Sequence, residues 1–437
     1  MRSLTNQLLY TGPDRERYNM LWNIAGSFCY ALASMVLSVL VMRMAGEEEG
    51  GIFSFGYSTL GQQLFIVAYF GIRPFQITDG KGEYSFGDYL RHRFLTCLAA
   101  VAGGAVFLAV MGAQGIYDGH KTAVLLLLVF YKVIDGFADV YESEFQRQGS
   151  LYLTGKSNFF RTVLSVCACL GTLAVSGSVL AACAGAVCAQ MLGVLLFNLD
   201  VIRVLPGVDW KRRKGAAAGL FRSTSFLFAS VFLDFYIFSS AKYAIDRYMS
   251  DGDSGYFNLI FMPTSVIYMI ANFIIRPFLT KLTAMWDGGE LAAFKRELGR
   301  LGMLVGGLTV LAAAGAFVLG RFVLSLVEML LGQGYGGSLA GYWMDFGVIV
   351  LGGGFYALAN LMYYALVIMR RQKAIFSIYA VGALAAWLIS PPLVKGFGIH
   401  GAAACYLCLM IGLTLGFGLW TVRVCGLEER KKTGYGG

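Results

Sequence analysis

The sequence has little charge and few residues suited to acid–base or metal chemistry. Of 437 residues only 14% are charged, whereas a soluble globular chain carries about 25%. The three histidines lie far apart in the chain, and the nine cysteines share no ligand spacing beyond one CxxC inside an apolar run. We therefore expect no metal site, no Cys–His nucleophile and no bound cofactor.

Enzyme signatures are also scarce. The sequence contains no Walker A, GxSxG or HExxH pattern. Asp251-Gly252-Asp253 has the form of a glycosyltransferase DxD, but the composition favours a short Gly/Asp/Ser loop. The partly apolar stretch 321–341 is expected to extend the ninth span before a Gly-rich loop at Gly332 to Gly341, so no predicted external loop exceeds roughly a dozen residues. A membrane polymerase or ligase would be expected to carry a large external loop. These features favour a protein that is not an enzyme.

Apolar residues are abundant instead, at 57% of the chain. They form runs long enough to cross a bilayer, which takes about 20 residues per helix. We predict an all-α, polytopic membrane protein with about twelve transmembrane helices. The predicted spans are 20–43, 51–72, 94–112, 122–143, 157–176, 179–202, 223–248, 256–280, 299–320, 342–369, 374–394 and 397–424.

One pattern occurs twice. A basic residue, Arg43 or Arg247, is followed by a Gly-aromatic turn at Gly51 or Gly255, with a constant shift of 204 residues. The triplets Arg73-Pro74-Phe75 and Arg276-Pro277-Phe278 follow with a shift of 203. Such a repeat predicts two pseudo-symmetric six-helix bundles of parallel topology, as in transporters that work by alternating access.

The repeat suggests a domain division. We predict an N-terminal six-helix bundle over 1–205, a basic cytoplasmic linker over 206–222 and a C-terminal six-helix bundle over 223–437. The linker contains Lys211-Arg212-Arg213-Lys214, which favours contact with anionic lipid headgroups.

Loops that contain basic residues alternate along the chain with loops that are acidic or nearly neutral. Loops with Arg73, Arg147 and Lys281 alternate with loops such as Glu47-Glu48-Glu49. This bias predicts that both termini face the cytoplasm of a bacterial cytoplasmic (inner) membrane. It also accounts for most of the net charge of +9 without any nucleic-acid partner.

Charge inside the predicted spans is the main functional signal, because it is costly there. Asp135, Asp139 and Glu142 lie on one face of the fourth span, at spacings of four and three. Glu142 is close to the cytoplasmic end, so we expect it to be solvated. Asp234 lies near the centre of the seventh span, and Lys242 follows it. We predict that Asp139 and Asp234 face a central cavity.

Several further motifs give the chain a resemblance to a known family. It is similar to the Wzx-like polysaccharide flippases of the multidrug/oligosaccharidyl-lipid/polysaccharide (MOP) exporter superfamily. The resemblance covers essentially the whole chain. It is carried by Tyr18-Asn19-Met20-Leu21-Trp22-Asn23, Arg43-Met44-Ala45-Gly46 with Gly50-Gly51-Ile52-Phe53-Ser54, Gly71-Ile72-Arg73-Pro74-Phe75-Gln76-Ile77-Thr78-Asp79, Tyr141-Glu142-Ser143-Glu144-Phe145-Gln146-Arg147 and Gly398-Ile399-His400-Gly401-Ala402-Ala403.

The resemblance implies a MATE/MOP-like fold and transport of a polyprenyl-diphosphate-linked oligosaccharide from the inner to the outer leaflet. The partners would be this substrate, membrane lipids, and a polysaccharide polymerase and glycosyltransferases. Arginine forks suit phosphate oxygens, and polar or aromatic side chains suit the sugar. The candidate substrate-binding residues are Arg43, Arg73, Arg247, Arg276, Lys242, Gln62 and Asn272, with Tyr268 and Tyr363 beside them. The candidate ion-coupling residues are Asp135, Asp139 and Asp234.

Two other functions remain open. A multidrug or cation antiporter of the same superfamily has the same fold, although the arginines favour an anionic substrate. A membrane polymerase or ligase acting on the same sugars is the second alternative, and the short external loops count against it. Neither the sugar, the coupling ion nor the oligomeric state follows from the sequence.

The repeated arginines yield a first prediction. Lysine would keep the charge at Arg73 or Arg276 but lose the bidentate fork to a phosphate. We expect export of lipid-linked sugar to fall in Arg73→Lys and Arg276→Lys, and to fall further in the glutamine variants, at equal protein level in the membrane. Wild-type export by both glutamine variants would mean that these arginines only direct topology.

Overall fold

The computed structural model describes residues 2–11, 14–79, 82–332 and 339–432, and within these residues it contains helices and no strands. It divides the chain into two compact units, residues 1–232 and 233–437. The division falls inside the long helix α11 (Ala216–Tyr248), so the first half of this helix packs with the first unit.

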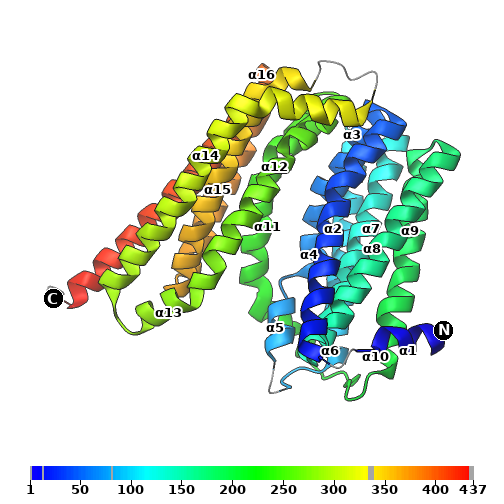
Figure 1. The fold of residues 1–437 in the computed structure, drawn as a ribbon, viewed down its shortest axis with the longest axis horizontal. Helices are drawn as coiled ribbons and strands as arrows, with labels where there is room; N and C mark the ends of the chain where they lie inside the picture. Colours follow the sequence, from blue (N-terminus) through cyan, green and yellow to red (C-terminus); the bar gives the residue numbers. More distant parts are fainter. Residues whose placement is uncertain (1, 12–13, 80–81, 333–338, 433–437) are drawn as a thin grey trace. The chain divides into compact units, whose positions relative to one another are not determined.

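The first unit is built from long helices joined by short turns (Figure 1). Before α11 its elements are α1 (Arg2–Leu9), α2 (Arg15–Ala45), α3 (Glu47–Phe55), the π-helical segment η1 (Gly56–Leu60), α4 (Gly61–Tyr69), α5 (Arg73–Thr78), α6 (Phe86–Ala113), α7 (Gly119–Arg147), α8 (Leu151–Ser176), α9 (Val179–Val194), η2 (Leu195–Leu199) and α10 (Asp200–Val204).

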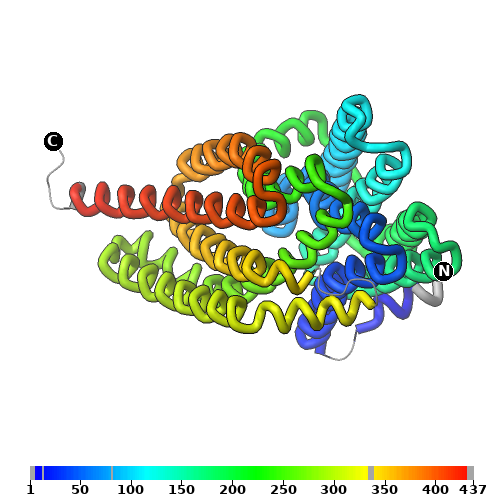
Figure 2. Tube along the Cα trace, turned by 90° about the horizontal axis from the view of Figure 1, so that it is seen from above, coloured from blue at the N-terminus to red at the C-terminus, as the bar shows by residue number. Residues whose placement is uncertain are grey.

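The second unit repeats this style with fewer, longer helices. After α11 its elements are α12 (Asp251–Ile275), the 3-10 turn η3 (Arg276–Phe278), α13 (Leu279–Asp287), α14 (Leu291–Leu331), η4 (Ala340–Tyr342), α15 (Trp343–Ile368) and α16 (Gln372–Lys432). Figure 2 shows the long helices α14, α15 and α16 in the yellow-green to red part of the trace, and α15 packs against both of the others.

Nine helices of the described residues are long and apolar enough to cross a membrane. One of them, α16, is bent at Gly398 (φ 58°), so it supplies two of the predicted spans. Two predicted spans are not among these nine helices. The span 51–72 is divided among the shorter elements α3, η1 and α4, and α7 carries three charged residues, Lys132, Asp135 and Asp139, within its apolar stretch. The twelve predicted spans therefore all correspond to helical segments, and the predicted all-α polytopic fold is confirmed.

Short polar motifs set where helices begin. Ser85 and Asp88 form a capping box at the start of α6, and Ser250 and Asp253 form another at the start of α12. Each pair satisfies backbone N–H groups that have no partner within the helix. The Asp251-Gly252-Asp253 sequence is thus the first turn of α12, where acidic side chains favour the positive end of the helix dipole.

The two Arg-Pro-Phe triplets occupy similar places in the chain. Arg73 begins α5 after α4, and Arg276 begins η3 after α12. Proline is tolerated at these first positions because its missing N–H needs no partner there. A short helix, α5 or α13, then precedes the next long one. Likewise, Arg43 and Arg247 lie in the last turns of α2 and α11.

The loop after α5 is held by Asp79, the last residue of the family-like motif. Its carboxylate accepts hydrogen bonds from the backbone N–H groups of Glu83 (2.8 Å) and Tyr84 (2.9 Å). Burial opposes ionisation of this carboxyl, but the bonds to Tyr84 and Glu83 outweigh it and lower the pKa of Asp79 below its usual value.

The basic linker packs against the start of α6. The Gly87 N–H donates to the carbonyl of Asp209 (3.1 Å), and the Arg213 N–H donates to Asp88 (2.7 Å). Trp210 lies edge-on to Phe86, with the ring centroids 4.9 Å apart. A Cβ at position 87 would lie 2.3 Å from the Lys211 carbonyl oxygen, so this contact requires glycine.

Helices α2 and α8 approach closely at two glycines. A Cβ added to Gly26 would lie 2.4 Å from the Gly155 carbonyl oxygen, and one added to Gly155 would lie 2.1 Å from the Trp22 carbonyl oxygen. Both neighbours are backbone atoms, which cannot rotate away. Small residues at helix interfaces are the usual means of close packing in membranes.

This contact predicts that Gly155→Ala destabilises the protein by about 1–3 kcal/mol, because α2 and α8 must separate. The measurement is thermal unfolding of the purified protein in detergent. Gly171→Ala is the matched control, since it lies on the same helix with nothing within 4 Å of its added Cβ. Equal unfolding temperatures for the two variants would contradict the proposed close contact.

Candidate functional site

In the first unit, the charged residues of α7 form a buried cluster with arginines from three other helices. Asp135, Asp139 and Glu142 are each only 5–6% exposed. Two turns of α7 separate Asp135 from Glu142, and Asp139 lies between them, as the spacing predicts. Their partners are Arg73 of α5, Arg93 of α6 and Arg161 of α8.

Arg161 bridges two of these carboxylates. One guanidinium nitrogen lies 2.6 Å from Asp135 and the other lies 2.9 Å from Glu142. Arg161 is itself only 2% exposed. The expectation that Glu142 is solvated is therefore wrong, because α8 covers this end of α7 and brings a guanidinium to it.

Asp139 is held by two guanidinium groups. Arg73 lies 2.5 Å from one carboxylate oxygen, and Arg93 lies 2.8 Å from the other. Arg93 is fully buried and also donates to the Ala68 carbonyl (3.0 Å). The Arg73 side chain keeps 25% of its surface exposed, and its second nitrogen donates to Gln146 (3.0 Å). Arg73 is thus the accessible guanidinium on Asp139.

A buried lysine extends the cluster. Lys132 donates to the Tyr30 hydroxyl (3.2 Å), which in turn donates to Asp135 (3.1 Å). The Lys132 ammonium also lies 3.8 Å from the centre of the Tyr57 ring. Lys132 is 2% exposed, so its charge is stabilised by a hydroxyl and an aromatic face.

The second unit holds a different arrangement around Asp234 of α11. The Tyr356 hydroxyl donates to its carboxylate (2.8 Å), and Tyr379 presents a second hydroxyl. Tyr268 stacks on Tyr356, with ring centroids 5.1 Å apart. Within the described residues Asp234 forms no ion pair. A carboxylate among phenol groups is therefore available to a proton or a small cation.

Asn272 lies beside this group of tyrosines. Its amide nitrogen donates to the Tyr268 carbonyl (2.9 Å), and its oxygen accepts from Asn360 and Tyr364 (both 3.3 Å). We call Asp234, Tyr268, Asn272, Tyr356, Tyr363, Tyr364 and Tyr379 the tyrosine cluster. Asp234, Asn272, Tyr268 and Tyr363, which the sequence analysis selected, belong to it.

The other predicted substrate-binding residues are not brought together. Lys242 is buried, and its ammonium lies 4.3 Å from the centre of the Phe261 ring. Arg43, Arg247 and Arg276 are exposed, and Gln62 is half-buried on α4. Their roles in binding stay predictions.

Three charged members of the cluster in the first unit were not predicted from the sequence. Lys132 and Arg161 lie inside predicted spans, so the rule applied there to aspartates would have found them. Arg93 lies just outside the predicted span 94–112, which begins one residue after it, whereas α6 begins at Phe86.

The fold is shared with known membrane transporters. An inward-closed structure of the lipid II flippase MurJ superposes with a TM-score of 0.70 at 12% identity, covering 92% of this chain and 87% of that one. An inward-facing multidrug resistance MATE family transporter of the MOP superfamily gives 0.67 at 11%, covering 93% and 99%. A MOP superfamily transporter from Pyrococcus furiosus gives 0.56 at 13%, covering 97% and 98%. No curated protein matches this chain.

The arrangement of helices is therefore that of these transporters, and the protein is a multi-pass membrane protein. Residues 17–282, more than half of the chain, match the family described as polysaccharide biosynthesis protein. This chain belongs to that family. The family resemblance and the fold class expected from the sequence are confirmed.

Because Arg161 pairs with two buried carboxylates, its replacement provides a test. Arg161→Gln leaves Asp135 and Glu142 buried without their partner, which costs about 3–5 kcal/mol for a buried pair. We expect a large loss of thermal stability in detergent. Arg203→Gln is the control, because its pair with Asp200 is long (3.8 Å) and exposed. If Arg161→Gln unfolds at the wild-type temperature, the cluster does not stabilise the first unit.

Proposed function

We propose that this protein is a flippase that moves a polyprenyl-diphosphate-linked oligosaccharide from the inner to the outer leaflet of a bacterial cytoplasmic membrane, with both termini in the cytoplasm. It would work by alternating access and use no cofactor. Membership of the polysaccharide biosynthesis protein family supports a sugar-linked substrate. The fold that this chain shares with MurJ, a lipid II flippase, is consistent with a lipid-linked one.

The charge of the first unit carries the proposal. Every acidic side chain of the buried cluster on α7 is paired with an arginine, and Lys132 adds a positive charge. A cation antiporter needs carboxylates that its substrate can reach. Paired carboxylates with a surplus cation favour an anionic substrate instead. Arg73 is the accessible member, and a diphosphate oxygen could exchange with Asp139 on its guanidinium.

The second unit suits the remaining needs of such a substrate. Aromatic rings and amide groups in the tyrosine cluster offer apolar faces and hydrogen-bonding groups to a sugar. We propose that Asp234 takes up the coupling proton or sodium ion, since it has hydroxyl partners and forms no ion pair within the described residues. Coupling at Asp135 or Asp139 would first require their release from arginine.

Reconstituted transport distinguishes the candidate functions. The full chain is placed in liposomes with a polyprenyl-diphosphate-linked oligosaccharide that carries a fluorophore on the sugar, and a membrane-impermeant quencher reports its leaflet. We expect the fluorophore to change leaflet, and a cationic dye such as ethidium not to be moved. Dye movement without sugar movement would indicate a multidrug antiporter, which the MATE-like fold allows. Formation of longer glycan chains would indicate a polymerase or ligase.

Asp234 provides a prediction on coupling. We expect Asp234→Asn to abolish the dependence of flipping on a proton or sodium gradient, because an amide cannot exchange the ion. Tyr356→Phe removes the hydroxyl at 2.8 Å and should shift the ion concentration needed for half-maximal flipping. Asp287→Asn, at an exposed carboxylate of the same unit, is the control and should behave as wild type. Unchanged gradient dependence in Asp234→Asn would remove this residue from the mechanism.

A further inference from the structure

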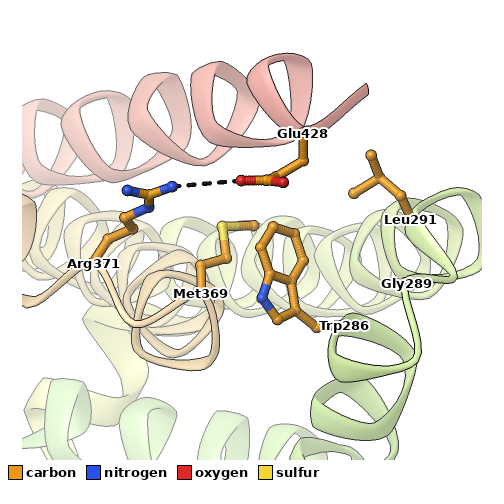
Figure 3. A pocket seen from close by; sticks show the side chains of 6 residues that line it. All are labelled: Trp286, Gly289, Leu291, Met369, Arg371 and Glu428. Carbon is orange, nitrogen blue, oxygen red and sulfur yellow. Dashed lines mark ion pairs between the residues drawn. The ribbon is translucent and has the colours of Figure 1, made fainter. Parts of the chain in front are cut away.

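A pocket lies at the end of the second unit where α13, α14, α15 and α16 meet. It has a volume of about 240 Å³ and is lined by Trp286, Gly289, Leu291, Met369, Arg371 and Glu428 (Figure 3). Leu291 and Met369 are buried, and Trp286 is half-buried against Phe294, with ring centroids 5.3 Å apart. The lining is therefore apolar on one side and charged on the other.

Among the described residues that line this pocket, Arg371 and Glu428 carry opposite charges. In Figure 3 Arg371 and Glu428 point toward one another, and Met369 and Trp286 lie beside them. The guanidinium and carboxylate are 3.7 Å apart, which is longer than a hydrogen bond, and the side chains are 43% and 28% exposed. A partly exposed pair at this distance is weak, so the phosphate and ammonium of a ligand can compete with it.

The chain leaves α15 just before Arg371, in a turn with an unusual backbone conformation. Arg370 adopts a left-handed conformation (φ 58°) at the end of α15, a position that normally favours glycine. The N–H groups of Arg370 and Arg371 donate to Val367 and Leu366 (both 2.9 Å), which closes the helix end. Arg370 then reaches Asp287 at the end of α13 (3.4 Å).

We propose that this pocket binds a phospholipid with a phosphoethanolamine headgroup. The phosphate oxygens would accept hydrogen bonds from the guanidinium of Arg371. The primary ammonium, separated from the phosphate by two methylene groups, would donate to the carboxylate of Glu428. The glycerol and the first methylenes would contact Leu291, Met369 and Trp286. A phosphatidylglycerol headgroup has the same phosphate but no ammonium to offset the charge of Glu428, and a choline headgroup has no N–H to donate. Tryptophan and basic residues are typical of a membrane–water interface.

The test is lipid binding to the full-length protein by native mass spectrometry, with short-chain phosphatidylethanolamine, phosphatidylcholine and phosphatidylglycerol in turn. We expect phosphatidylethanolamine to bind about tenfold more tightly than phosphatidylcholine, the effect of one charge-assisted hydrogen bond. Glu428→Gln should remove this preference, and Arg371→Gln should weaken binding of every phospholipid. Equal affinity for the three lipids in the wild type would overturn the proposal.

Two controls separate the explanations. Lys295→Gln and Glu429→Gln change a neighbouring exposed ion pair that does not line the pocket, so both should keep the preference. Free glycerophosphoethanolamine tests whether the headgroup alone is enough, and we expect it to compete only weakly without acyl chains. Competition as strong as that of the lipid would instead assign the pocket to a soluble amine phosphate. Retention of the preference in Glu428→Gln would contradict the proposed recognition.

Discussion

The first unit depends on the pairing of charges that have been removed from water. Asp135 and Glu142 are buried two turns apart on α7, and the single guanidinium of Arg161 lies between them. Either carboxylate would be strongly destabilising without it. Because Arg161 comes from α8, Arg93 from α6 and Arg73 from α5, satisfying the charges of α7 also determines which helices pack around it. The packing of these helices and the pairing of their buried charges therefore depend on each other.

The second unit solves the same problem with neutral groups. Asp234 faces the hydroxyls of Tyr356 and Tyr379, and no arginine pairs with it within the described residues. A carboxylate in such surroundings can gain or lose an ion without disrupting an ion pair, whereas Asp135 and Asp139 cannot. Because of this difference we propose separate roles for the two units, with anion recognition near Arg73 and ion coupling at Asp234.

Much of the fold could be predicted from the sequence because bilayer thickness sets the length of apolar runs. The Arg-Pro-Phe triplets, which the repeat singled out, both lie at the start of short elements. The sites were harder. Lys132 and Arg161 were visible as charges in apolar runs but were not recognised. Arg93 was placed in a loop because hydropathy does not locate a helix start, which the Ser85–Asp88 capping box decides.

The sequence by itself determined that the chain is a helical membrane protein, since composition and the length of apolar runs can be read directly from it. It also determined that the acidic residues of α7 share one face, since helical periodicity alone requires this. Only the tertiary structure decided their partners. Arg161 and Asp135 are far apart in the chain, and nothing in their spacing shows that α8 packs on α7 or that Asp234 meets Tyr356 of α15. Partner choice depends on the packing of whole helices, in which close contacts such as Gly26 on Gly155 bring distant residues together.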